Sequence, residues 1–171
     1  MDAKIRKIVM TAVLAALTFA ATMVIRIPVP VTGGYVHPGD GFVILAGAFV
    51  GPVYGFLAAA IGSALADVVG GYLVYAPATF VIKGLAALAA ALVFGKWRRM
   101  PGLLAGGLLA AAVVVLGYFL FEGVLYGFPA AAVAMLPNLV QGLVGVGIAA
   151  LLNVRGLVTR LGRQTGKFRK N

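Results

Sequence analysis

Residues 33–83 read GGYVHPGDGFVILAGAFVGPVYGFLAAAIGSALADVVGGYLVYAPATFVIK, a stretch in which nearly every side chain is apolar. Apart from tyrosines, its ionisable side chains are His37, Asp40, Asp67 and Lys83. Segments this apolar are typical of membrane-spanning helices. A charge at membrane depth is costly unless it has a partner, water or a function. The stretch therefore predicts membrane-embedded helices that carry a polar site.

The composition of the whole chain agrees with this stretch. Of its 171 residues, 63% are hydrophobic and 11% are charged, whereas soluble domains are roughly half apolar and about a quarter charged. The sequence therefore predicts an integral membrane protein. Because the chain has no cysteine and a single histidine, cysteine chemistry is excluded and a histidine-rich metal site is not expected.

Six apolar segments are long enough to be considered helices, so we expect an all-α bundle of six transmembrane helices in a single domain, residues 1–171. The expected spans cover residues 5–25, 40–50, 53–69, 77–94, 103–121 and 129–153, followed by a basic tail at 154–171. The first apolar run is longer than that of a signal peptide, so it is interpreted as a retained helix. Small residues four apart, such as Gly55, Ala59 and Ser63, favour close helix packing.

Basic residues form three clusters beside the apolar spans, and the net charge is +10. One cluster precedes the first span, one contains Lys96, Arg98 and Arg99, and one lies in the tail. By the positive-inside rule all three face the cytoplasm, so both termini are expected there. This pattern is weighed above nucleic-acid binding, and a secondary contact with anionic lipid headgroups is compatible with it.

The first connection on the outer side, residues 26–39, is long and reads RIPVPVTGGYVHPG. Pro28 and Pro30 oppose a helix and favour extended backbone. Long connections in compact proteins are often lids or binding loops. We therefore interpret this segment as a lid that carries His37, rather than as a plain connector.

Polar residues occur in pairs near the outer ends of three spans. The pairs are Thr79 with Lys83, Tyr118 with Glu122, and Asn138 with Gln141. Each pair is three or four residues apart and so shares one helix face. The layout indicates a pocket that opens outward, with apolar walls and a few convergent polar groups. Tyr72 and Tyr75 either line this pocket or belong to an interfacial aromatic belt.

Two carboxylates have structural interpretations. Asp40 follows Gly39 and is expected to cap the N-terminus of the second span. Asp67 lies near the end of a span, where a negative charge opposes the helix dipole. An ion pair between Asp67 and Lys83 would relieve that cost. Lys83 lies too deep in its span to be explained by solvation.

No catalytic motif occurs in the chain: there is no Ser-His-Asp set, H-E-x-x-H, Walker A loop or G-x-S-x-G. We therefore expect no enzyme, no cofactor and no metal, and any coupling to ATP must come from another protein. Ala12, Ala16 and Ala20 recur every four residues in the first span. Such a flat face lets another helix approach closely, either within the bundle or from a partner.

These residues resemble a known family, the substrate-binding S components of energy-coupling factor (ECF) vitamin transporters, over nearly the whole chain. The most specific matches are Gly39-Asp40, Gly51-Pro52, the run GSALAD at 62–67, Gly71-Tyr72, Tyr75-Ala76-Pro77 and Lys83-Gly84. Their spacing is similar to the riboflavin-type subfamily, which includes members assigned to hydroxymethylpyrimidine or vitamin B6.

The resemblance implies a subunit in a prokaryotic cell membrane that binds a vitamin from outside and closes its first outer loop over it. It would then dock to a membrane coupling subunit and two cytoplasmic ATPases, through Ala12, Ala16 and Ala20. The resemblance also implies that the ligand contacts come from that loop and from the outer halves of spans four to six. On this chain they map to His37, Tyr72, Tyr75, Lys83, Tyr118, Glu122, Asn138 and Gln141.

The aromatic residues bear on the substrate. Trp97 is the single tryptophan and is expected on the cytoplasmic side, so only tyrosines can stack on a ligand. This favours a one-ring compound such as pyridoxine, pyridoxal or hydroxymethylpyrimidine, with riboflavin or another vitamin as the alternative. A further alternative is a self-sufficient channel or proton-coupled carrier with a relay through Asp67, Lys83 and Glu122. A third is an assembly subunit without a ligand.

Overall fold

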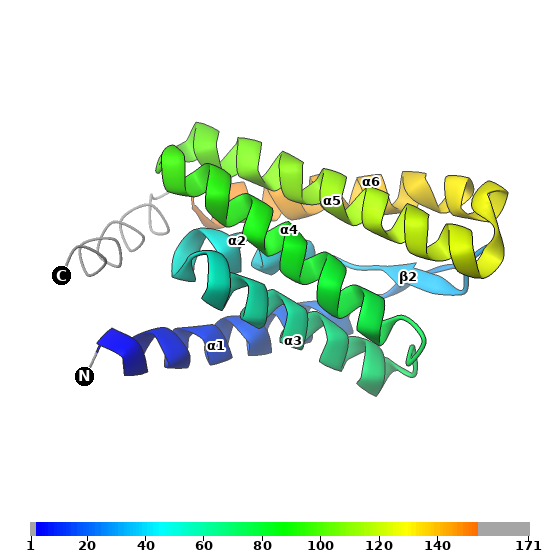
Figure 1. Cartoon of the computed structure of the whole chain (residues 1–171), viewed down its shortest axis with the longest axis horizontal. Coiled ribbons are helices and arrows are strands. Elements are labelled where there is room, and N and C mark those ends of the chain that lie inside the picture. The colour runs from blue at the N-terminus through cyan, green and yellow to red at the C-terminus, as the bar shows by residue number, and fades with distance from the viewer. Residues whose placement is uncertain (1–2, 154–171) are drawn as a thin grey trace.

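The computed structural model describes residues 3–153, which form six helices and one two-stranded hairpin. The helices are α1 (Ala3–Val24), α2 (Asp40–Val50), α3 (Pro52–Gly70), α4 (Ala76–Lys96), α5 (Met100–Tyr126) and α6 (Phe128–Leu152). The strands are β1 (Ile27–Val29) and β2 (Gly34–Val36). The long helices run along the longest axis of the molecule (Figure 1). The predicted tail, 154–171, lies outside the described residues.

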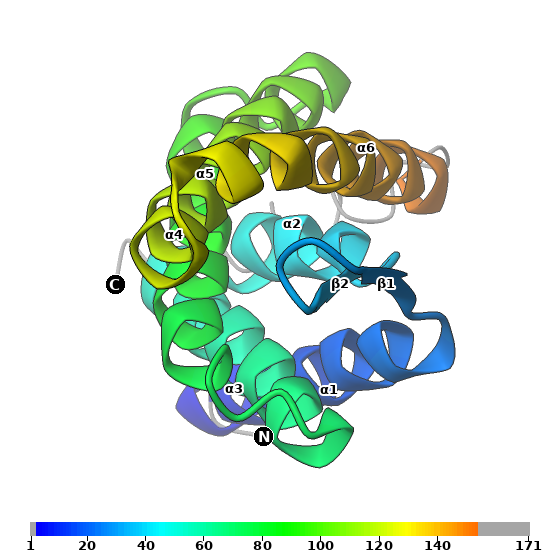
Figure 2. The same cartoon turned by 90° about the vertical axis from the view of Figure 1, so that its right-hand side faces the viewer.

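Helix α2 is the central element of the bundle. It contacts all five other helices, and an end view places it inside the arc that they form (Figure 2). Along that arc, α1 contacts α3, α3 contacts α4, α4 contacts α5 and α5 contacts α6. The sequence of α2, DGFVILAGAFV, is apolar on every side, as expected for a helix enclosed by others.

Five of the described helices are long and apolar enough to cross a membrane: α1, α3, α4, α5 and α6. Helix α2 has 11 residues, which gives a length of roughly 16 Å, about half the thickness of the hydrocarbon core. The predicted all-α bundle is thus confirmed as a mainly helical fold. The number of spans and the cytoplasmic location of the termini stay predictions.

Small residues allow the helices to approach closely. A Cβ atom on Gly47 of α2 would meet the backbone of Ala87 in α4, and one on Gly62 of α3 would meet the backbone of Ala15 in α1. Glycine also permits the turns between helices. Gly51, which joins α2 to α3, has φ of 86°, a conformation that L side chains rarely adopt.

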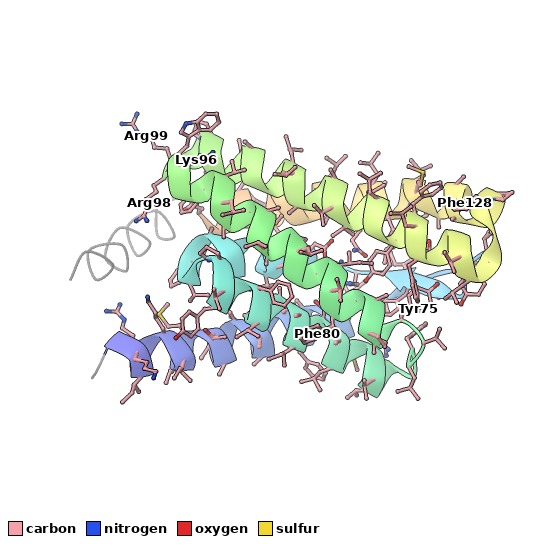
Figure 3. All side chains as sticks on the ribbon, viewed as in Figure 1. Tyr75, Phe80, Lys96, Arg98, Arg99 and Phe128 are labelled. Atoms are coloured by element: carbon pink, nitrogen blue, oxygen red, sulfur yellow. The ribbon has the colours of Figure 1, made fainter. Side chains whose placement is uncertain are left out.

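The two ends of the bundle carry different side chains. Lys96, Arg98 and Arg99 lie at one end, whereas Tyr75 and Phe128 lie at the other (Figure 3). The start of α1, with its own basic residues, lies at the same end as the α4–α5 connection (Figure 1). We call this the basic end, and we call the opposite end, where β1 and β2 lie, the hairpin end. Two of the three predicted basic clusters therefore share an end.

Residues 26–39 contain the hairpin. Ile27 pairs with Val36 and Val29 pairs with Gly34 in antiparallel register, so the extended backbone expected around Pro28 is present. Thr32, in the turn, is buried. A Cβ atom on Gly34 would meet the ring of Tyr75. The hairpin therefore lies directly on the helices, over the end of the bundle where the polar residues are found.

Candidate functional site

Polar side chains from five helices and from the segments just before α2 and α4 are buried together at the hairpin end. They are His37, Asp40, Asp67, Tyr75, Thr79, Lys83, Tyr118, Glu122, Asn138 and Gln141. In an apolar interior each such group is unfavourable unless it has a hydrogen-bond partner. The structure therefore brings together residues that are far apart in the sequence, and most of them do have partners.

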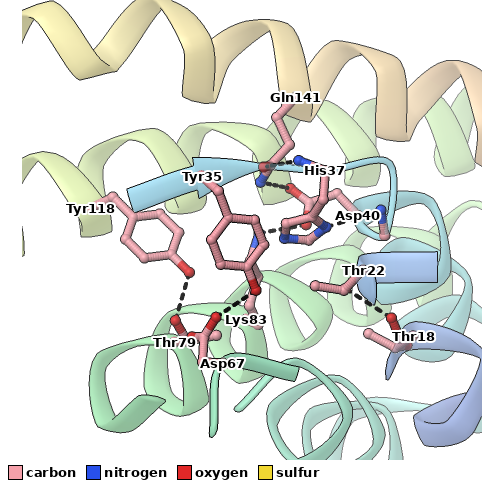
Figure 4. A network of polar contacts seen from close by, with 11 residues as sticks. Thr18, Thr22, Tyr35, His37, Asp40, Asp67, Thr79, Lys83, Tyr118 and Gln141 are labelled. Carbon is pink, nitrogen blue, oxygen red and sulfur yellow. Dashed lines mark hydrogen bonds and ion pairs between the residues drawn. The ribbon is translucent and has the colours of Figure 1, made fainter. Parts of the chain in front are cut away.

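The centre of this group is the carboxylate of Asp40, at the start of α2. Lys83 Nζ donates to Asp40 Oδ1 at 2.5 Å, and Gln141 Nε2 donates to Asp40 Oδ2 at 2.9 Å. The backbone N–H of His37 donates to Gln141 Oε1 at 2.9 Å (Figure 4). Lys83 is fully buried, and Asp40 is its counter-ion. This network ties α2, α4 and α6 to the end of the hairpin segment.

Two predictions about the carboxylates are wrong. Asp40 makes no capping hydrogen bond, because it is the first helical residue and Gly39 occupies the cap position. Lys83 forms its ion pair with Asp40 rather than with Asp67. The reason is the central position of α2, which places Asp40 against α4 and α6. Two partners on other helices replace the local cap.

Asp67, near the end of α3, is bound by a tyrosine of the hairpin. Tyr35 Oη donates to Asp67 Oδ1 at 2.6 Å, and the Tyr35 ring lies 4.5 Å from that of Tyr72 between centroids. Burial and the hydrogen bond to Asp67 raise the pKa of Tyr35, so its hydroxyl remains a donor. Sequence reasoning missed Tyr35. Its position in the predicted lid, two residues before His37, was the available signal.

Glu122, near the end of α5, is also bound by a tyrosine. Tyr75 Oη lies 3.1 Å from Glu122 Oε1 and 2.8 Å from the backbone oxygen of Thr32 in the hairpin turn. A phenol has one hydrogen, so it donates to one of these oxygens at a time. Tyr75 is buried and contacts the hairpin, so it is not a lipid-interface residue of the kind the sequence left open.

Tyr118 connects these groups to the centre. Its hydroxyl is 2.8 Å from Thr79 Oγ1, and Lys83 Nζ lies 5.5 Å from its ring centroid. The rings of Tyr75 and Tyr118 are 6.3 Å apart between centroids. The predicted pairs on α4 and α5 therefore do face one region, and aromatic rings form much of its wall. Asn138 on α6 is buried but is not a member of these hydrogen-bonded groups.

His37 is buried in an uncharged form. The N–H of Gly39 donates to its Nδ1 at 3.1 Å, which leaves the proton of the neutral ring on Nε2. Burial, with a smaller effect of the Lys83 charge, lowers the pKa of His37 to about 3. Over residues 3–153, no three His, Asp or Glu side chains gather as a metal site requires.

The alanine residues of α1 lie on the outside of the described bundle. Ala12, Ala16 and Ala20 are all exposed. Ala12 and Ala16 line a groove of about 690 Å³ between α1 and α3, whose other walls are apolar side chains such as Leu57 and Ile61. Among residues 3–153, no other helix fills this face.

The fold and the site together define a membrane protein of several packed helices with one enclosed polar region. Residues 2–156 match the model of a family described as the S component of the ECF-type riboflavin transporter, and the chain belongs to this family. The predicted family is confirmed. S components are transporter subunits rather than enzymes, and they work with an ECF module in vitamin or precursor uptake.

Relatives and a solved structure agree with this assignment. The thiamine precursor transporter HmpT of Lactococcus lactis subsp. cremoris (strain MG1363) is 31% identical over 175 residues, covering 99% of this chain and 98% of HmpT. An uncharacterized protein from the gap 3′ region of Pyrococcus woesei is 40% identical over 126 residues, covering 73% of this chain and 84% of that protein. The S component of a bacterial ECF transporter has the same fold, with a TM-score of 0.68 at 22% identity over 89% of this chain and 95% of that one.

Proposed function

We propose that this chain is the substrate-binding subunit of an ATP-driven ECF importer and that it binds a small one-ring vitamin precursor of the hydroxymethylpyrimidine type. The observation that carries the proposal is the buried polar region under the hairpin, in a chain of the S-component family. HmpT, which is 31% identical to this chain, is named as a thiamine precursor transporter. This name supports a pyrimidine as the substrate. Pyridoxine and pyridoxal are of similar size, and riboflavin is the alternative.

The proposed contacts are His37, Tyr72, Tyr75, Lys83, Tyr118, Glu122, Asn138 and Gln141. The tyrosines would stack on one aromatic ring, and the amide and carboxylate groups would bind its polar substituents. Trp97 follows the last residue of α4, is 62% exposed, and lies next to Lys96 at the basic end, far from this region. A ligand with one ring therefore suits the site better than a three-ring ligand.

The hairpin would act as the lid. Three hydrogen bonds connect it and the segment after it to the helices: Tyr35 to Asp67, Tyr75 to the Thr32 oxygen, and the His37 N–H to Gln141. An opening movement has to break these contacts, at a net cost of about 0.5–1.5 kcal/mol for each neutral bond. A substrate that binds the same side chains would replace them and favour closure again.

The orientation follows from the positive-inside rule, which assigns the basic end to the cytoplasm of a prokaryotic cell and the hairpin end to the outside. The exposed alanine face of α1 would then dock to the membrane coupling subunit, which carries two cytoplasmic ATPases. A proton relay through Asp67, Lys83 and Glu122 is not favoured, because Lys83 donates to Asp40 and the family is that of S components.

Equilibrium binding to the purified chain in detergent tests the proposal. Titration calorimetry with hydroxymethylpyrimidine, pyridoxine, pyridoxal and riboflavin should give a sub-micromolar dissociation constant for one of them. The absence of binding below micromolar concentration across this panel would contradict the proposal. Uptake into liposomes by the chain alone, driven by a pH gradient, would instead favour the carrier.

A further inference from the structure

A separate cavity lies at the basic end, at the other end of α2 from Asp40. Its volume is about 460 Å³. Its walls come from the ends of α2 and α4, the starts of α1 and α3, and the α4–α5 connection. Three cationic side chains line it together with apolar ones: Lys7, Lys96 and Arg98 with, among others, Phe49 and Leu92. The proposed substrate site makes no use of this cavity.

The two lysines of this cavity have no carboxylate partner in the described part of the chain. The acidic side chains among residues 3–153 are all buried at the hairpin end: Asp40, Asp67 and Glu122. Lys7 is half-buried, and its Nζ lies 5.8 Å from the ring centroid of Tyr54. This contact positions the ammonium over the ring, and no hydrogen bond within residues 3–153 uses its three N–H groups. They can therefore donate to an oxygen ligand.

Helix ends add partial charges of both signs to the cavity. The C-terminal ends of α2 and α4 are partly negative and the N-terminal end of α3 is partly positive, each by about half an elementary charge. Lys96, in the last turn of α4, offsets the partial charge of that helix. Three full positive charges outweigh these dipoles, so the cavity has a positive potential. Because like charges repel, an anion that binds between them would be stabilising.

The position of the cavity indicates which anion fits. Helix α4 has 21 residues, which gives a length of roughly 32 Å, about the thickness of the hydrocarbon core. Lys96, at the end of this helix, therefore lies at the depth of the lipid headgroups. Two apolar residues of the lining, Val53 and Leu92, are 68% and 54% exposed. Cations beside exposed apolar surface match a phosphate that is joined to acyl chains.

We propose that this cavity binds the phosphate of an anionic phospholipid, with Lys7, Lys96 and Arg98 around the headgroup and Leu92 next to an acyl chain. The inference goes beyond the proposed function, because it adds a lipid ligand at the opposite end of the bundle from the substrate site. Basic pockets between membrane helices on the cytoplasmic side are suited to such headgroups. Tyr54 also lines the α1–α3 groove, so the lipid lies next to the proposed docking face.

The single tryptophan, Trp97, is the reporter for a test on the unaltered chain. It lies between two lining residues in the sequence, and bromine atoms quench tryptophan fluorescence only at short range. The chain is reconstituted in phosphatidylcholine vesicles that contain the same fraction of either brominated phosphatidylglycerol or brominated phosphatidylcholine. The phosphatidylglycerol should bind near Trp97 at least about fivefold more strongly, the effect of one cation near an anionic lipid surface. Equal quenching by the two lipids would overturn the inference.

Charge variants then assign the preference to the cavity. Lys7→Gln combined with Lys96→Gln removes two of the proposed ligands, and the preference for phosphatidylglycerol should be lost. The matched control is Lys4→Gln combined with Arg99→Gln. It removes the same charge from the same end but from residues that do not line the cavity, so the preference should remain. Equal loss in both double variants would show a diffuse effect of net charge and would overturn the inference. Thermal unfolding checks that each variant is folded.

Two further measurements separate the lipid from other anions. Inorganic phosphate should reduce the phosphatidylglycerol preference no more than chloride does at the same ionic strength, because it has no acyl chain to bind. Loss of the preference in phosphate alone would assign the cavity to the free anion, and the lipid assignment would be wrong. Uptake that fails in the Lys7→Gln, Lys96→Gln variant while the lipid preference persists would assign these lysines to a protein partner, which also contradicts the inference.

Discussion

The hairpin end and the α1–α3 face of this protein are constructed in opposite ways. At the hairpin end, polar side chains from five helices and the hairpin segment are buried, and most of them are hydrogen-bonded to one another. On the α1–α3 face, small and apolar side chains are left exposed along a groove. Recognition of a small polar ligand needs enclosed donors and acceptors, whereas close docking of a helix in lipid needs a flat surface. The two regions should therefore respond independently to mutation.

The strongest test of this independence is Ala16→Trp, on the exposed face of α1. The indole would fill the groove and block a partner helix, so uptake of the vitamin into cells should be abolished. Binding to the purified chain should be unchanged, because Ala16 lies on the outside of the bundle. Uptake assays and calorimetry on the same variant measure the two effects. Ala132→Trp, at an exposed position of α6, is the control and should leave uptake unchanged. Loss of binding in A16W would show that the two regions are not independent.

Lys83→Met should have the next largest effect, on stability. It leaves Asp40 buried without its cation, and breaking one partner of such a pair typically costs about 3–5 kcal/mol. The double variant Lys83→Met with Asp40→Asn should recover part of this loss, because neither charge remains buried alone. Thermal unfolding in detergent measures both. Equal unfolding temperatures for the single and double variants would show that the unpaired charge of Asp40 is not the cause of the lost stability.

Truncation of the proposed ligand contacts should affect binding more than stability. Asn138→Ala and Glu122→Ala should each weaken binding of the vitamin at least tenfold, or by about 1.4 kcal/mol. Asn138 is the sharper case, because its side chain is outside the hydrogen-bonded groups of the site. Calorimetry gives the dissociation constants, with the exposed Leu136→Ala on α6 as a control. Unchanged affinity would remove the substituted residue from the site.

The smallest expected effect is a pH dependence of hairpin closure through His37. Its pKa is about 3 when buried and about 6.5 when it is exposed. The closed state therefore binds fewer protons. Its stability is fully present above pH 6.5 and declines as the pH falls toward 3. At pH 5.5 the loss is about 1.4 kcal/mol, which hydrogen exchange of residues 27–36 can detect. His37→Gln should remove the difference between pH 7.5 and 5.5, and a persistent difference would assign it to another group.

Sequence reasoning could find most members of the site but few of their partners. Helical spacing placed Tyr118 with Glu122 and Asn138 with Gln141 on shared faces, since period and burial follow from local sequence. It did not indicate Tyr35, because an aromatic residue in a loop has no periodic signal. It assigned Lys83 to Asp67 because both lie near the hairpin end. Whether Lys83 pairs with Asp40 or with Asp67 depends on how α2, α3 and α4 pack together, and local sequence does not show this.

By itself, the sequence determined that this protein is a helical membrane bundle with its polar residues gathered toward one end, because apolar runs and scarce charges leave few other folds. Only the tertiary structure decided that Asp40 pairs with Lys83 and Gln141, that tyrosines bind Asp67 and Glu122, and that the alanine face of α1 is exposed. The physical reason is that α2 lies at the centre and the hairpin lies across the bundle end. Each pairing thus joins residues that are 32 to 101 positions apart in the chain.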